Sequence, residues 1–290
     1  MSPTLKPSLE EISVVIVTFN SSHILANALK SVPASCKTII IDNASVDDSS
    51  EVARRFGARY VQNDKNLGFG TACNIGAAMS DRKYILFLNP DAVLIDNALT
   101  KLLETLAMHP DAAAVGPKFI TESGKSVWRH RSILHPQRKS SLPAQEPEGL
   151  CCVPLLTGAA ILCRRDIFEK IGGFDENIFM YFEDDDLSKR LVDAGGYLLY
   201  EPQAEVLHDF GMSSGHSFAL TRMRNKKKIQ SQIFVMKKYG YCVNFKKIYI
   251  KTIQRLVFSL VKFDTNRTAA ALGTLEGLRE MRRLTQATNE

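Results

Sequence analysis

Short apolar runs alternate with helix-like segments along the N-terminal part of the chain. Residues 12–18 (ISVVIVT), 38–41 (TIII) and 84–88 (YILFL) are rich in β-branched and aliphatic side chains, and helical periodicity marks residues 23–32 and 45–56. Strands that are apolar along their whole length are typical of a parallel sheet covered on both faces, because neither face meets water. The alternation predicts an α/β fold with a parallel sheet covered by helices on both faces.

Three of the predicted strands end in polar side chains. In sheets of this kind, ligands bind beyond the carboxyl ends of the strands. Any one of these residues could simply form a turn, as Asx residues often do after a strand, but together they favour a binding site. The residues are Thr18, Asn20, Asp42, Asn43, Asn89 and Asp91.

Further elements follow along the chain. A Gly-rich turn opens an Ala-rich helix within residues 66–79, and residues 125–150, rich in Pro, Ser, Arg and His, predict a long loop over or beside the site. Apolar residues 155–163 predict another buried strand, residues 165–171 a short helix, and residues 204–207 a last strand.

The most unusual stretch is a block of four acids at residues 183–186 (EDDD). It follows four large apolar residues at 179–182 and precedes a segment with helical periodicity at 187–194. Acids are favoured at a helix N-terminus, so capping is one interpretation. Four successive carboxylates exceed what a cap needs, and some are therefore expected to point into a cleft or bind a cation.

Several function classes lack their sequence signals. The chain has no dinucleotide-binding G-x-G-x-x-G, no phosphate-binding G-x-x-x-x-G-K-[ST] and no hydrolase G-x-S-x-G motif. Its six cysteines form no C-x-x-C pair, so a zinc site is not expected. No secretion signal is recognisable and no apolar stretch approaches the roughly 20 residues that span a bilayer. We expect a cytoplasmic protein without a transmembrane helix.

Charge is distributed unevenly along the 290 residues. The net charge is +6, but residues 221–290 hold 16 Lys/Arg against 4 Asp/Glu, which leaves 21 against 27 for the rest. Within residues 226–263, apolar residues recur at helical spacing with Lys and Arg off that stripe, which is typical of a basic amphipathic helix. This extension could pack on the α/β part, bind an anionic membrane surface or bind nucleic acid; no nucleic-acid-binding motif accompanies the charge.

Taken in order, these motifs resemble family 2 glycosyltransferases of the GT-A fold, in particular their rhamnosyltransferase-like branch. The resemblance implies a Rossmann-like α/β fold with a mixed, mostly parallel sheet flanked by helices. The matching segments cover about residues 12–225, and the aromatic-acid block before a helix is their most specific part. They are VVIVTFN (14–20), IIIDNASVDDS (39–49), NLGFGTACNIG (66–76), LFLNPDA (86–92), residues 155–196 and HDFGMSS (208–214).

The resemblance implies transfer of a sugar from a nucleotide diphosphate donor to an acceptor hydroxyl with inversion at the anomeric carbon. The implied donor is a dTDP- or UDP-sugar, with L-rhamnose from dTDP-rhamnose as the branch-level expectation. The acceptor is a glycan or lipid-linked glycan of the cell envelope. Donor binding is implied for Thr18, Asn20, Asp42, Asn43, Asn66, Gly68, Asn74, Asn89, Asp91 and Arg224.

The resemblance also implies a divalent metal and a catalytic base. Mg²⁺ or Mn²⁺ would neutralise the leaving diphosphate on Asp91 and His208, although Asn89 stands where the family's Asp-x-Asp motif has its first acid. Asp184 matches the base that deprotonates the acceptor hydroxyl, and Glu183 is the alternative. His208 could otherwise simply end a strand.

Two alternatives stay open at this point: another donor sugar (galactose, glucose or galactofuranose) on the same fold, and a non-catalytic relative that only binds nucleotide sugars. The expected domains are a GT-A catalytic domain over residues 1–225 and a basic amphipathic helical extension over residues 226–290. Within the first, the nucleotide-sugar half covers about 12–120 and the acceptor half about 150–225. We expect the extension to reach a membrane surface rather than nucleic acid.

Overall fold

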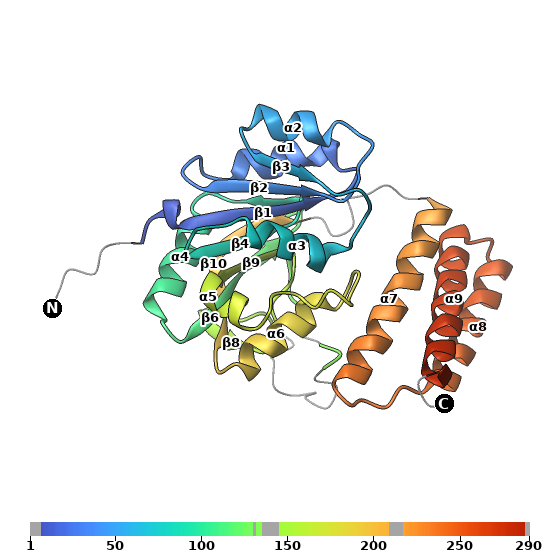
Figure 1. The fold of residues 1–290 in the computed structure, drawn as a ribbon. Coiled ribbons are helices and arrows are strands. Elements are labelled where there is room, and N and C mark those ends of the chain that lie inside the picture. The colour runs from blue at the N-terminus through green and yellow to red at the C-terminus, as the bar shows by residue number, and fades with distance from the viewer. Residues whose placement is uncertain (1–6, 130–131, 135–144, 209–216, 288–290) are drawn as a thin grey trace. The chain divides into compact units, whose positions relative to one another are not determined.

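The computed structural model describes residues 7–129, 132–134, 145–208 and 217–287. These residues fall into two compact units (Figure 1). The first lies within Met1–Glu176 and Glu183–Ser214, and the second within Asn177–Phe182 and Gly215–Glu290.

The first unit is an α/β sheet with helices. Among the residues described, its 10-stranded sheet has the order β3-β2-β1-β4-β9-β6-β10-β5, with β7 paired to β6 and β8 paired to β10. The strands are β1 Ile12–Thr18, β2 Lys37–Asp42, β3 Arg59–Gln62, β4 Tyr84–Leu88, β5 Ala92–Leu94, β6 Ala112–Ile120, β7 Ser126–Val127, β8 Cys151–Val153, β9 Ala160–Arg164 and β10 Tyr197–His208. The helices are η1 Leu9–Glu11, α1 Ser22–Ser31, α2 Ser49–Arg55, α3 Phe69–Ala78, α4 Ala98–Met108, α5 Arg165–Lys170 and α6 Glu183–Asp193.

Parallel pairing joins β3, β2, β1 and β4, and also β6 and β10. Strand β9 runs antiparallel between β4 and β6 and so joins the two parallel groups. Strands β5, β7 and β8 pair antiparallel at the periphery. The mixed sheet flanked by helices expected from the sequence is confirmed. Counted by strand pairs, it is not mostly parallel as expected, because five of the nine pairs among the described residues are antiparallel.

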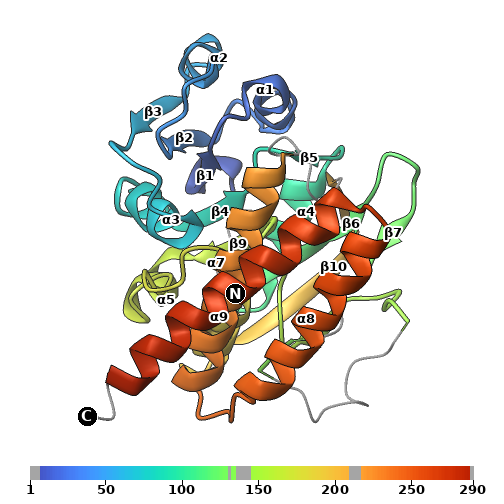
Figure 2. The same cartoon turned by 90° about the vertical axis from the view of Figure 1, so that its right-hand side faces the viewer.

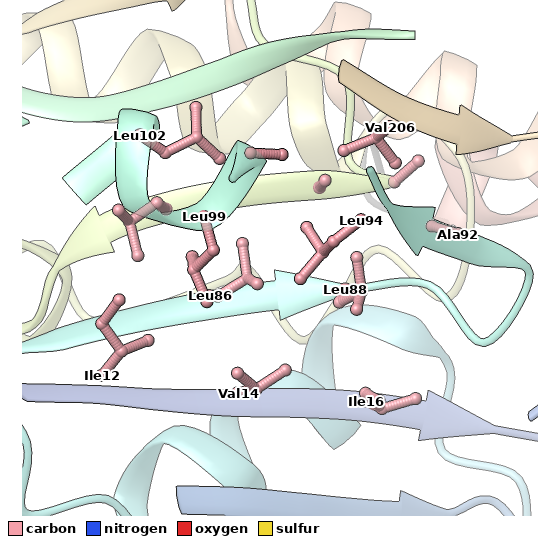
Figure 3. Close-up of a cluster of buried hydrophobic side chains, with 14 of the residues drawn as sticks. Ile12, Val14, Ile16, Leu86, Leu88, Ala92, Leu94, Leu99, Leu102 and Val206 are labelled. Carbon is pink, nitrogen blue, oxygen red and sulfur yellow. The ribbon is translucent and has the colours of Figure 1, made fainter. Parts of the chain in front are cut away.

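Alternate side chains of the central strands enter two cores, one on each face of the sheet. Ile12, Val14 and Ile16 of β1 pack with apolar residues of α1, α2 and α4, as Figure 3 shows in part. Val15 and Val17 of the same strand pack with residues of α3, α5 and α6. This alternation explains why the strand is apolar throughout: each face is buried under helices.

The structure shifts several predicted boundaries. Helix α6 begins at Glu183 rather than at residue 187, so the acid block forms its first turn, where the helix dipole favours negative charge. Strand β9 begins only at Ala160, and residues 155–159 form a loop before it. Strand β10 extends from Tyr197, well before the predicted residue 204, because it pairs with β6 along most of that strand.

The described residues of the second unit form the helices α7 Phe218–Lys238, α8 Phe245–Val261 and α9 Thr265–Ala287, and α9 contacts both of the others (Figure 2). Two glycines of α9 allow a close approach to α7. A Cβ at Gly273 would overlap the backbone carbonyl of Arg222, and one at Gly277 would overlap Ile229. Residue 225, the expected domain boundary, lies inside α7.

Residues 177–182 belong to this helical unit. The Lys227 ammonium lies 4.7 Å from the ring centroid of Phe179, and that of Lys228 lies 5.3 Å from the ring of Tyr181. Such distances are typical of cation–π contacts. In the described part of the chain, no helix combines the length and the apolar character needed to cross a bilayer.

Candidate functional site

Strands β1, β2 and β4 end at one edge of the sheet, and the predicted polar residues lie there. Thr18 pairs with Asp42 in the parallel register of β1 and β2, and Ile16 pairs with Leu88 at the end of β4. Thr18 is fully buried, and its hydroxyl has no hydrogen-bond partner among the described residues. Buried hydroxyls are nearly always paired in native proteins, so a ligand or water is the expected partner of Thr18.

Asp42 is also fully buried, and its carboxylate organises the loop that follows β2. Oδ1 accepts the backbone N–H of Ser45 at 2.6 Å, and Oδ2 accepts the hydroxyl of Tyr60 at 2.8 Å. Asn20 holds the same loop from the end of β1: its N–H donates to the Ser45 hydroxyl at 2.8 Å, and its Oδ1 accepts the N–H of Val46 at 2.9 Å. Tyr60 and Ser45 are thus parts of this edge that sequence reasoning missed.

Asn43 connects the end of β2 to the Gly-rich turn. Its Nδ2 donates to the carbonyl of Gly68 at 3.0 Å, and its Oδ1 accepts from Asn63 Nδ2 at 2.9 Å and from the N–H of Leu67 at 3.3 Å. Asn66 closes the turn by accepting the Gly68 N–H at 2.9 Å. Gly68 has φ +89°, a conformation that L side chains rarely adopt, which explains glycine immediately before α3. The structure therefore brings Asn43, Asn66 and Gly68 together.

Asn74 on α3 forms a two-point clamp on a distant backbone. Its Oδ1 accepts the N–H of Phe174 at 2.8 Å, and its Nδ2 donates to the carbonyl of the same residue at 2.9 Å and to Glu176 at 3.2 Å. Phe174 is buried against the rings of Phe69 and Phe87. In the structure, Asn74 thus ties α3 to the turn that follows α5.

The turn after β4 carries Asn89 and Asp91. His208, the last residue of β10, places Nε2 3.1 Å from Oδ1 of Asp91, and both side chains are about 95% buried, with 5% and 4% of their surface exposed. Pairing of β10 with β5 causes this contact, because His208 lies opposite Ala92, the residue after Asp91. Two residues 117 positions apart thus form one buried polar pair.

This pair fits a divalent cation that also binds a diphosphate. A carboxylate oxygen and an imidazole nitrogen converge within 3.1 Å, and Mg²⁺ or Mn²⁺ sites often use one or two protein ligands together with substrate phosphates. Over the ranges that the structure describes, no cluster of three or more His, Cys, Asp or Glu side chains suited to a metal occurs. The residues therefore fit a shared protein–substrate site rather than an all-protein one.

The carboxylates of the acid block at the start of α6 bind arginine side chains and backbone N–H donors. Arg129 forms ion pairs with Asp184 through one guanidinium nitrogen and with Asp185 through another. Asp185 also accepts from Ser132, and Asp186 accepts from Arg190 Nε at 2.7 Å. The expectation that some of these acids bind positive charge is confirmed.

Arg129 itself was not anticipated. It lies within residues 125–150, which the sequence identified only as a long, basic loop. Four adjacent acids indicate that positively charged side chains lie nearby. Several Arg and Lys residues of that loop were equivalent candidates for this pairing, so the sequence does not single out Arg129. Its planar guanidinium offers a separate nitrogen, fixed in one plane, to each of the two carboxylates.

One loop connects the acid block to the turn after β4. The N–H of Gly158 donates to Asp184 Oδ2 at 3.1 Å, and the carbonyl of the next residue, Ala159, accepts the N–H of Asn89 at 2.9 Å. Adjacent Cα atoms are about 3.8 Å apart, so Asp184 and Asn89 flank the same dipeptide. A Cβ on Gly158 would lie 3.3 Å from Cβ of Asp184, closer than most such contacts, so glycine suits this position.

Burial and like charges raise two pKa values in the block. Desolvation and the neighbouring Asp184 charge raise the pKa of Glu183 to about 8, and the same two causes raise the pKa of Asp185 to about 6. The Glu183 Oε2 atom is buried and has no hydrogen-bond partner within the described chain. At neutral pH the Glu183 carboxyl is therefore mostly protonated.

Two bulky residues adopt left-handed backbone conformations directly before α6. Tyr181 has φ +66° and Phe182 has φ +68°. Non-glycine residues in this region cost of order 1 kcal/mol or more each, and such strain is concentrated at functional sites. Nothing in the sequence pattern indicated this strain.

Arg224, the remaining predicted residue, lies on α7 of the second unit.

Comparisons with known proteins show which family the chain is similar to. Residues 13–172 match the Glycosyl transferase family 2. An N-acetylglucosaminyl-diphospho-decaprenol L-rhamnosyltransferase of Mycobacterium tuberculosis is 30% identical over 241 residues, covering 70% of this chain and 77% of the relative. The rhamnosyltransferase WbbL of Escherichia coli is 28% identical over 221 residues, covering 67% and 82%.

A solved mannosyltransferase from Pyrobaculum calidifontis, in complex with GDP-Man and Mn²⁺, has a similar fold. Its TM-score is 0.58 at 14% identity, and the match covers 97% of this chain and 88% of that one. The family match includes the strand edge with Thr18 and Asp42, the Gly-rich turn and the Asn89–Asp91 turn. The chain belongs to glycosyl transferase family 2 and is a glycosyltransferase of the GT-A fold.

Proposed function

We propose that this glycosyltransferase moves a sugar from a nucleotide diphosphate donor to an acceptor hydroxyl with inversion at the anomeric carbon. The observation that carries the proposal is the connection of Asp184, through Gly158 and Ala159, to the turn that presents Asp91, whose carboxylate contacts His208 of β10. A carboxylate that can take a proton thus lies near a buried polar pair that fits a cation and diphosphate.

In this proposal, Asp184 is the base. The acceptor oxygen attacks the anomeric carbon, its proton passes to the Asp184 carboxylate, and the bond from that carbon to the phosphate oxygen breaks with its electron pair. Arg129 and the Gly158 N–H hold the carboxylate in place. Glu183 is the less suitable base at neutral pH, because a carboxyl with a pKa of about 8 is mostly protonated there.

The donor would lie along the edge formed by β1, β2 and β4. Thr18, Asn20, Asp42 and Asn43 would border the nucleoside, and the turn at Asn66 and Gly68, together with Asn89, would complete the proposed set on this edge. Asp91 and His208 would hold Mg²⁺ or Mn²⁺ against the diphosphate. The bound cation would neutralise charge on the leaving group.

For the donor sugar we propose L-rhamnose, carried by dTDP. Two relatives that share 28–30% identity over two thirds or more of this chain are named rhamnosyltransferases, and one of them is named for a lipid-linked diphospho-decaprenol acceptor. We therefore propose a glycan or lipid-linked acceptor of the cell envelope. A lipid-linked acceptor lies in a membrane, which the enzyme must therefore reach. We further propose that the protein is cytoplasmic and associates peripherally with an anionic inner leaflet through residues 226–263.

The base assignment is tested with Asp184→Asn and Glu183→Gln. Asn cannot accept the acceptor proton, so Asp184→Asn is expected to abolish release of nucleoside diphosphate in the presence of acceptor while donor binding persists. Glu183→Gln is expected to retain transfer. Full activity in Asp184→Asn, at an unchanged melting temperature, would refute the role of Asp184.

The donor assignment is tested by thermal shift with a panel of nucleotide sugars. We expect dTDP-rhamnose with Mn²⁺ to raise the melting temperature more than UDP-galactose, UDP-glucose or UDP-galactofuranose. The largest shift with one of the other three would assign a different donor on the same fold. No shift with any donor, together with no release of nucleoside diphosphate, would support a protein that has lost transfer activity.

A further inference from the structure

Helix α8 has an unusual distribution of side chains. Its two buried residues are small and polar: Thr252, whose hydroxyl donates to the carbonyl of Ile248, and Ser259, whose hydroxyl donates to that of Leu256. Its large apolar residues at the C-terminal end are instead exposed: Val257, Phe258, Leu260 and Val261 expose 53–68% of their surface. The helix therefore packs in its own unit through Thr252, Ser259 and the partly buried Phe245 and Ile248, and it leaves the large apolar residues of its C-terminal end exposed.

The exposed apolar residues form a ridge along one side of α8, which is interrupted only by Gln254. Ile250, Val257 and Val261 are spaced by seven and four residues, which places them on one face of an α-helix. Phe258 and Leu260 lie on either side of that face. Isolated exposed apolar residues are normal, but several on one helix face mark an interaction surface.

Phe263 extends the ridge beyond the helix end. It is 92% exposed, and it adopts φ +52°, the left-handed conformation that commonly ends a helix with glycine. A bulky residue at such a position is strained, and no described residue of the second unit buries the ring in return. An external partner for this aromatic ring would account for both observations.

Cations flank the ridge. Lys246, Lys247 and Lys251, together with Asn244, Ile250 and Gln254, line an open depression of about 380 Å³ at the N-terminal end of α8. Arg255 and Lys262 continue the positive charge toward the other end, and residues 245–263 contain no Asp or Glu. The surface thus combines apolar side chains with uncompensated positive charge.

The other basic helix of this unit differs. Ile229, Ile233 and Val235 of α7 are buried, and Ile229 and Ile233 form a small core with Leu278 of α9. The apolar side chains of residues 226–238 are thus used inside the unit. In the described part of this unit, most of the exposed large apolar side chains lie on α8 and the turn after it.

We infer that the α8 surface, defined as the ridge Ile250, Val257, Phe258, Leu260, Val261 and Phe263 with its flanking Lys and Arg residues, binds the surface of an anionic phospholipid bilayer. The helix would lie in the interfacial plane, with the ridge among the acyl chains and Lys246, Lys247 and Lys251 at lipid phosphates. A second copy of the chain is a poorer partner, because a symmetric contact would bring these cations together. This inference narrows the peripheral association proposed above to one helix face.

The first test is cosedimentation of the full chain with vesicles of phosphatidylglycerol and phosphatidylcholine, compared with vesicles of phosphatidylcholine alone. We expect binding to the anionic vesicles that Val261→Ser/Phe263→Ser weakens by about tenfold or more, since both apolar side chains leave the bilayer. The matched control is Phe56→Ser/Met108→Ser, which removes exposed apolar side chains from the first unit and is expected to bind like the parent.

The charge arm uses Lys246→Gln/Lys247→Gln/Lys251→Gln. We expect this variant to lose most of the preference for anionic vesicles, because three cations near the surface are removed. Lys30→Gln/Lys125→Gln/Lys170→Gln has the same change in net charge on exposed residues of the first unit and is expected to keep the preference. Melting temperatures of all variants, measured without vesicles, identify any that misfold.

The possible failures are distinguishable. Undiminished vesicle binding by a folded Val261→Ser/Phe263→Ser variant would overturn the α8 surface while leaving membrane association intact. No vesicle binding by the parent would overturn both. Concentration-dependent dimerisation of the parent that the same double variant abolishes would assign the surface to a second copy instead. Release of nucleoside diphosphate in the absence of vesicles is expected to be equal in parent and variant, so none of these outcomes bears on the proposed transfer reaction.

Discussion

Arg129 is the residue on which the acid block most depends. Asp185 is completely buried at its side chain, and Asp184 exposes 12% of its own, yet the two carboxylates are adjacent in sequence and share this one guanidinium. Removing one partner from a buried cluster of charges destabilises the folded protein, because the remaining charges are then buried without an opposite charge beside them. The geometry of the proposed base therefore depends on a residue outside α6.

We predict that Arg129→Met lowers thermal stability more at pH 8 than at pH 5. Asp185 has a raised pKa of about 6 even with Arg129 present, and losing the cation raises that pKa further. The stabilisation from a raised carboxyl pKa is present at low pH and is lost as the pH rises through the folded-state value, so the damage grows with pH. Melting temperatures at both pH values measure it, and Arg59→Met, an exposed arginine, is the control. Equal losses at the two pH values would contradict the prediction.

Glu183 leads to a second pH-dependent prediction. Its pKa rises from 4.5 to about 8 on folding, so between these values the folded state binds more protons than the unfolded state and the chain loses stability as pH increases. Glu183→Gln keeps a neutral side chain at every pH. We expect the melting temperature of this variant, relative to the parent, to rise between pH 5 and pH 8. A difference in melting temperature between variant and parent that stays constant from pH 5 to pH 8 would show that Glu183 ionises normally.

At the scale of elements, Asn74 joins α3 to the turn after α5. Both polar groups of the Phe174 backbone are satisfied by this one side chain. The resemblance assigns Asn74 to donor binding, whereas the structure shows an inter-element clamp. The two roles have different experimental consequences.

We predict that Asn74→Ala lowers the free energy of unfolding by about 1–3 kcal/mol, the cost of leaving buried backbone groups unpaired. Urea denaturation measures this change. Asn27→Ala on α1 is the matched control, because it makes the same substitution at an exposed helical position. A weakened donor affinity with unchanged stability would instead support direct donor binding by Asn74.

At the scale of the whole molecule, Asp91 and His208 meet only because β10 returns to pair with β5. We predict that Mn²⁺ strengthens binding of nucleoside diphosphate, and that Asp91→Asn and His208→Gln each reduce this effect by about tenfold or more, as losses at metal sites commonly do. Calorimetric titration with and without EDTA measures the effect without relying on turnover. Asp96→Asn and His23→Gln, both exposed, are the controls. Metal-independent diphosphate binding in the parent would refute the site.

The elements nearest the N-terminus were the most predictable. Residues 12–18, 38–41 and 84–88 are strands as expected, because an apolar run between turn residues has few other stable states. Residues 112–120 were not identified as a strand, since AAAVGPKFI contains alanines, a glycine and a proline that weaken the local signal. That strand forms through its pairing with β9 and β10, which is a tertiary effect.

The sequence by itself determined the fold class, the three polar strand ends, the acid block and the basic C-terminal part, because each depends on local periodicity or on the order of residue types. Only the tertiary structure decided that Arg129 pairs with Asp184 and Asp185, that His208 reaches Asp91 and that Asn74 clamps Phe174. It also decided which face of α8 stays exposed. These contacts join positions far apart in the chain, and local propensity carries no information about which distant partner a side chain meets.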